Sequence, residues 1–92
     1  MANSKVEKFE FIALEAYRFL VCGQTGKAQE TLAEVYQQLL TFTELLPADK
    51  VQFLATLFTV MHNAQENNDL IYLADILRFE VLALIKVHFA NG

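Results

Sequence analysis

The sequence predicts an all-α fold, an antiparallel up-down-up-down four-helix bundle. Apolar residues recur at steps of three and four along four segments, as they do on one face of a helix with about 3.6 residues per turn. The connections between these segments are a few residues long, which makes successive helices antiparallel neighbours. The sequence lacks the alternation of apolar and polar residues that would indicate a strand. We expect a single domain over 1–92, with helices at 5–22, 26–45, 47–66 and 69–88.

The first helix follows a capping-box pattern, Ser4 with Glu7 three residues later, whose side chains can satisfy free backbone N–H groups at a helix start. Gly23 provides the left-handed residue with which helices often end. The apolar face between these two signals carries Val6, Phe9, Ala13, Tyr17 and Leu20.

The second helix has the most regular apolar spacing, and we expect Thr25 to cap it. Its opposite side is polar and should face water. Pro47 limits Leu46 to extended or turn geometry, so the second turn should lie there. The apolar face carries Ala28, Leu32, Val35, Leu39, Phe42 and Leu46.

The third helix can begin at Pro47, which is well tolerated as a first helical residue. It has two neighbouring apolar stripes, so its buried arc should be broad. Asn67 and Asn68 tolerate the left-handed conformation that ends a helix, and Asn68 or Asp69 can cap the next one. The two stripes are Val51, Leu54, Phe58 and Met61, and Phe53, Leu57, Val60 and Ala64.

The segment from Asn67 to His88 is the most apolar part of the chain, and its apolar residues are too many for one helical face. A helix that is apolar nearly all round is normally buried on more than one side, so the third helix or a second chain should cover it. Its main stripe is Leu70, Leu73, Leu77, Val81 and Leu84. We expect a core of Phe9, Ala13, Leu20, Leu32, Val35, Leu39, Leu54, Phe58, Met61, Leu73, Leu77, Val81 and Leu84.

The turn after the first helix invites two other interpretations. The spacing Tyr17…Gly23…Ala28…Leu32 resembles the inner part of a tetratricopeptide repeat, but the expected helices are too long for that repeat and the second half of the chain does not repeat the spacing. Residues 23–27 end in Gly-Lys like a phosphate-binding loop, but a helix precedes them and Ala28 replaces the required hydroxyl. A helix–helix turn explains the segment better.

Candidate reactive residues have structural explanations. His62 and Glu66 are one helical turn apart, but two ligands are too few for a metal site, and we interpret the pair as an ordinary surface contact. His88 can cap the last helix. Cys22 comes at a helix C-terminus, which disfavours a thiolate, and we interpret it as a buried, inert thiol. We expect no catalytic residue, no bound metal and no organic cofactor.

The side of the last helix away from its main stripe mixes apolar residues with an opposite-charge pair, Asp75 and Arg78. One interpretation is a solvated face with a weak salt bridge along the helix. The other is a protein interface, in which Asp75 of one chain meets Arg78 of another while apolar residues close around them. The candidate interface residues are Ile71, Asp75, Arg78, Phe79 and Leu82.

Charge and composition limit the classes of partner. The chain has 7 Lys and Arg against 11 Asp and Glu, for a net charge of -4 and no basic run, which argues against nucleic acid and anionic membranes. No apolar run approaches the ~20 residues that span a bilayer, and the start lacks a signal-peptide pattern. With one cysteine, the cytoplasm is the expected compartment.

The apolar content is high for a small soluble chain, 54% hydrophobic against 20% charged residues. Some of this surface has no obvious place inside a monomer. We therefore expect a non-enzymatic protein-interaction module that forms a homodimer. The alternative is a small acidic export or assembly chaperone that binds an amphipathic helix of a client protein.

Overall fold

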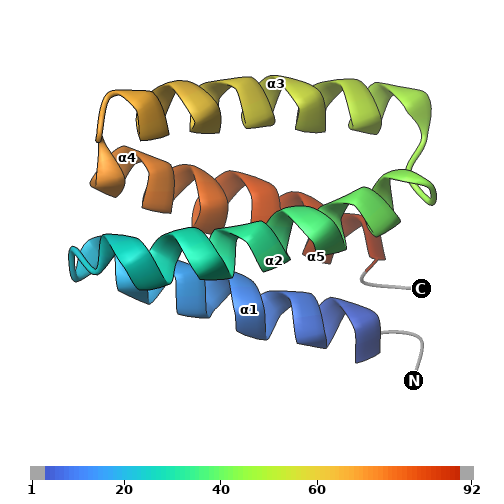
Figure 1. Cartoon of the computed structure of the whole chain (residues 1–92). Coiled ribbons are helices and arrows are strands. Elements are labelled where there is room, and N and C mark those ends of the chain that lie inside the picture. Colours follow the sequence, from blue (N-terminus) through green and yellow to red (C-terminus); the bar gives the residue numbers. More distant parts are fainter. Residues whose placement is uncertain (1–3, 90–92) are drawn as a thin grey trace.

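The computed structural model describes residues 4–89, which form a four-helix bundle. Successive helices run in opposite directions, so the chain goes up, down, up and down (Figure 1). No strand occurs among the described residues, and the helix ends lie within two residues of the predicted ones. The helices are α1 (Ser4–Val21), α2 (Thr25–Thr43), α3 (Ala48–Glu66) and a continuous C-terminal helix made of α4 (Leu70–Asp75), the π-helical segment η1 (Ile76–Val81) and α5 (Leu82–Phe89).

Two of the turns use left-handed residues at the predicted places. Gly23 has φ +74° and Asn68 has φ +57°, and the backbone N–H groups that follow them bond back to carbonyls of the preceding helix. Asp69 caps α4, since its carboxylate accepts a hydrogen bond of 3.3 Å from the Tyr72 N–H. The predicted Thr25 cap is wrong by one residue, because Thr25 is already helical and Gln24 precedes it without a side-chain cap.

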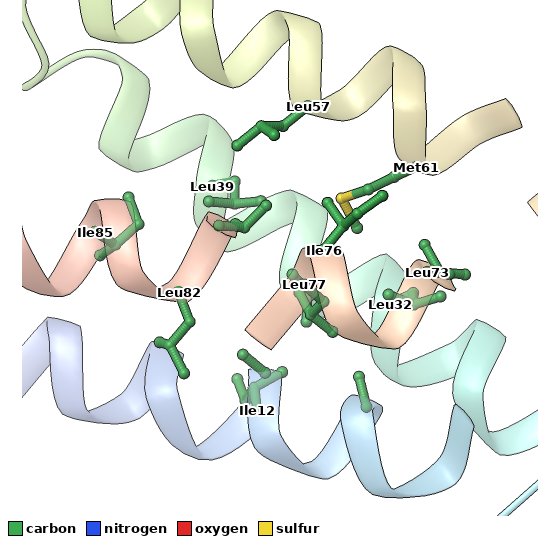
Figure 2. Close-up of a cluster of buried hydrophobic side chains, with 14 of the residues drawn as sticks. Ile12, Leu32, Leu39, Leu57, Met61, Leu73, Ile76, Leu77, Leu82 and Ile85 are labelled. Carbon is green, nitrogen blue, oxygen red and sulfur yellow. The ribbon is translucent and has the colours of Figure 1, made fainter. Parts of the chain in front are cut away.

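The core lies where the inward faces of all four helices meet. Figure 2 shows Ile12 of α1, Leu39 of α2 and Met61 of α3 directed towards the C-terminal helix. Every predicted core residue is buried except Phe58 and Leu84, which are partly buried. The third helix therefore covers one side of the C-terminal helix, which is one of the two arrangements that the sequence suggested.

The π-helical segment η1 keeps the buried residues of the C-terminal helix aligned along one side of the helix. Four core residues at four-residue spacing, Leu73, Leu77, Val81 and Ile85, each have no exposed surface. In an α-helix such a series drifts by about 40° at each step. The wider turn of a π-helix takes up this drift and brings Ile85 into the core. The prediction of Leu84 as a core residue assumed a regular α-helix and is wrong for that reason.

The helices do not pack equally closely. α1 lies close to α2 and to α4, and these three elements carry buried alanines, Ala13 and Ala16 on α1, Ala28 on α2 and Ala74 on α4. Small side chains let helix axes approach. α3 instead reaches α2 through two large rings, Tyr36 and Phe58, whose centroids are 5.6 Å apart in an edge-on arrangement. Phe58 is only partly buried because it lies in this wider seam.

Candidate interaction surface

An exposed apolar ridge runs along the C-terminal helix on the side opposite its core stripe. The ridge residues are offset by two positions from the core stripe, and two positions are about 200° apart around a helix. Ile71, Phe79 and Val87 are 57%, 59% and 77% exposed. We call this set the outer ridge; it consists of Ile71, Asp75, Phe79, Ala83 and Val87.

Most of the predicted interface residues lie on this face. Ile71, Asp75, Arg78 and Phe79 are all exposed. Leu82 is 5% exposed, so its assignment to the surface is wrong. Figure 2 shows the Leu82 side chain directed from the C-terminal helix towards α1, where it fills part of the core.

A groove separates the outer ridge from α3. Its floor and walls are mostly apolar, its volume is about 300 Å³, and two carboxylates, Asp75 and Glu80, lie along it without a cation. We call it the acidic groove. It is lined by Leu57, Val60, Tyr72, Asp75, Ile76, Phe79 and Glu80.

A second groove, of about 380 Å³, separates the outer ridge from α1. The Arg78 guanidinium lies 4.8 Å from the ring centroid of Tyr17 and 5.3 Å from that of Phe79, so two rings hold it in place. Lys86 Nζ donates to Glu10 Oε2 at 2.8 Å. With two cations and one carboxylate we call this the basic groove; it is lined by Glu10, Arg78, Phe79, Leu82, Ala83, Lys86 and Val87.

The salt bridge between Asp75 and Arg78 along the helix, which belonged to one of the two interpretations, is not formed. The ion pair of the described residues joins Lys86 to Glu10. Asp75 lines the acidic groove and Arg78 lines the basic groove, so the ridge separates the two charges. Both charges remain free to meet groups outside the chain.

The wide seam between α2 and α3 forms a further hollow that the sequence analysis missed. Leu40, 61% exposed, borders it beside Tyr36 and Phe58. The Tyr36 hydroxyl donates a long hydrogen bond of 3.5 Å to Gln65 Oε1, and burial raises the pKa of the Tyr36 phenol. His62 and Gln65 also line an adjoining pocket of about 400 Å³ at the end of the bundle. The sequence could have indicated this hollow, because the apolar residues Tyr36 and Leu40 lie next to the main apolar stripe of α2 and are not part of it.

The remaining candidate residues do not assemble a reactive centre. Cys22 is exposed in the turn after α1, so its interpretation as a buried thiol is wrong; the turn lies at the end of the bundle, beyond the core. His62 and Glu66 line the same pocket, but within residues 4–89 no three His, Cys, Asp or Glu side chains are grouped as metal ligands. The His88 ring packs edge-on against Phe89.

Comparisons with known proteins do not assign the chain to a family: no family model, curated protein or solved structure matches it. Within the described part of the chain, the helices are too short or too polar to cross a membrane.

Proposed function

We propose that the protein is a non-enzymatic protein-interaction module that forms a homodimer through the outer ridge. One observation carries the proposal: a single face presents an exposed apolar ridge between two grooves of opposite charge. A two-fold interface requires a patch that is complementary to itself. A face with both charges and an apolar centre meets this requirement, whereas a face of one charge does not.

The size of the face suits a small dimer. From Ile71 to Val87 the ridge is about 24 Å long at 1.5 Å per residue. Specific interfaces bury about 600–1,000 Å² per partner, and a single helical ridge with its two flanking grooves suits the lower end of that range. We expect a dimer that dissociates on dilution.

The apolar residues supply the affinity in this proposal. Burying one large apolar side chain contributes about 1.5–3 kcal/mol, and Ile71, Phe79 and Val87 are all largely exposed in the single chain. Phe79 borders both grooves, and a central aromatic residue is the usual anchor of an interface. The proposal keeps the cytoplasm as the compartment and excludes nucleic acid and membranes as partners, on the sequence grounds given above.

Light scattering over a series of concentrations tests the proposal. The purified protein should have the mass of a dimer at high concentration, and Phe79→Lys should have that of a monomer, because a charge replaces the anchor. Leu40→Lys is the matched control, since Leu40 is equally exposed but lies on α2. A wild-type protein that remains monomeric, or a Phe79→Lys protein that remains dimeric, contradicts the proposal.

A second candidate is a chaperone that holds an amphipathic helix of a client. The hollow beside Tyr36, Leu40 and Phe58 favours it, because such helices bind in apolar grooves between helices. This function predicts a monomer whose hollow binds a hydrophobic dye such as ANS. Leu40→Lys should then weaken dye binding and Phe79→Lys should not. The opposite result favours the homodimer.

A further inference from the structure

Charge is distributed unevenly across the outer ridge. On the α3 side, Asp75 and Glu80 line the acidic groove and no Lys or Arg does. On the α1 side, Arg78 and Lys86 line the basic groove, where Glu10 offsets one of the two charges. The two flanks of one face therefore carry opposite net charge.

Symmetry connects this distribution to the orientation of a dimer. When two copies meet face to face, their two-fold axis lies in the plane between them. An axis along the C-terminal helix makes the two helices run in the same direction and places the acidic flank of each copy against the basic flank of the other. An axis across the helix makes them antiparallel and places acidic against acidic and basic against basic.

We infer that the partner is a second copy whose C-terminal helix runs parallel to the first, with each basic groove against the acidic groove of the other subunit. The inference rests on the proposed homodimer and specifies its geometry. Like charges across an interface cost several kcal/mol, whereas complementary charges fix its orientation. The parallel arrangement has two complementary contacts and the antiparallel one has two repulsive contacts.

The contact at each flank joins Arg78 to Asp75 of the partner subunit. In a parallel pair these residues differ by three positions along the helix, or about 4.5 Å, which the long arginine side chain spans. Tyr17 and Phe79 already hold the Arg78 guanidinium in the groove, so less side-chain freedom is lost on binding. On the ridge itself, the apolar residues Ile71, Phe79 and Val87 meet the same residues of the other subunit close to the axis, while Asp75 lies at the edge of the ridge that lines the acidic groove and faces the basic groove of the other subunit.

Disulfide cross-linking in a Cys22→Ser background distinguishes the two orientations. Single cysteines are placed at the two ends of the ridge, by Ile71→Cys in one chain and Val87→Cys in another. A disulfide requires Cα atoms within about 7 Å. In the parallel dimer each variant cross-links with itself on mild oxidation. In an antiparallel dimer centred on Phe79, the two copies of Ile71 are about 24 Å apart, so only a mixture of the two variants cross-links.

Each outcome is decisive when combined with the mass measurement. Self-cross-linking of both variants, with none for a Leu40→Cys control, supports the parallel dimer. Cross-linking only in the mixture overturns the parallel orientation but leaves the homodimer standing. A dimer that cross-links at neither position shows that the ridge is not the contact. A monomer by light scattering removes the homodimer itself.

Charge reversal gives a second measurement. Arg78→Asp leaves four carboxylates and one cation, Lys86, at each flank and should raise the dissociation constant of the dimer at least tenfold, which corresponds to about 1.4 kcal/mol. Adding Asp75→Arg restores opposite charges at the contact and should recover most of the affinity. Unchanged affinity in Arg78→Asp overturns the assigned contact.

Discussion

The two sides of the bundle differ in how helices meet. α1 packs closely against α2 and α4 through buried alanines. α3 packs mainly through larger side chains, Leu54, Leu57 and Met61, with one buried alanine, Ala64, near its C-terminal end. A hollow lies on each side of it, one towards α2 and one towards the C-terminal helix. Close packing through alanines is therefore a feature of the α1–α2 and α1–α4 contacts, whereas hollows that a partner can fill lie on both sides of α3 and also between α1 and the outer ridge.

The largest expected effect on stability comes from a substitution in the core, between the two sides of the bundle. Leu77 has no exposed surface and lies between α1 and α3. Leu77→Ala should lower the free energy of unfolding by about 2–5 kcal/mol, through lost transfer energy and the cavity that remains. Leu84→Ala is the matched control and should cost less, because Leu84 is only partly buried. Urea unfolding measures both, and equal losses would contradict the role assigned to η1.

The difference in packing between α1 and α3 predicts that a larger side chain lowers stability more on α1 than on α3. Ala16→Leu should lower the free energy of unfolding by about 1–3 kcal/mol, because Ala16 is fully buried where helices approach closely. Val60→Leu should change it by less than about 0.5 kcal/mol, because the added methylene enters the acidic groove. Similar losses in urea unfolding of the two variants would remove the distinction between the sides.

The smallest expected effect concerns the α2–α3 seam at high pH. Burial raises the pKa of Tyr36 above its ordinary value of 10.0, so above pH 10 the unfolded chain loses this proton before the folded chain does. The folded state then binds more protons, and stability falls as pH rises through the folded pKa. Tyr36→Phe should lose less stability between pH 9 and pH 11 than the wild type in urea unfolding. An identical loss would show that this phenol is solvated in the folded protein.

The fold was predictable because the apolar residues recur with the helical period and because recognisable turn residues separate the helices. Gly23, Asn68 and Asp69 act as the backbone stop and cap that their chemistry predicts. The η1 segment was not predictable from periodicity, since a wider turn only becomes favourable once helices on several sides must all be packed. This is why Leu84 and Leu82 were assigned to the wrong faces.

The candidate surface was predictable in composition and not in arrangement. Ile71, Asp75, Arg78 and Phe79 do share one exposed region, as their spacing indicates. Their separation into two grooves depends on residues of other helices, which the residue spacing along one helix does not reveal. These residues are Tyr17 and Glu10 on α1 and Leu57 and Val60 on α3. The charges of both flanks come from the C-terminal helix, and the neighbouring helices determine which of these charged residues share a groove.

The η1 segment also determines where the chain tolerates a change in length. An α-helix completes three turns in about 11 residues, so the chain from Leu73 to Ile85 holds one residue more than it needs. A homologue lacking one residue in this segment, such as the exposed Glu80, would form a plain α-helix and keep Ile85 inside and Val87 outside. The same deletion within α1 would rotate everything after it by about 100° and misalign the buried alanines. Natural variants that are one residue shorter should therefore lack that residue within 76–81.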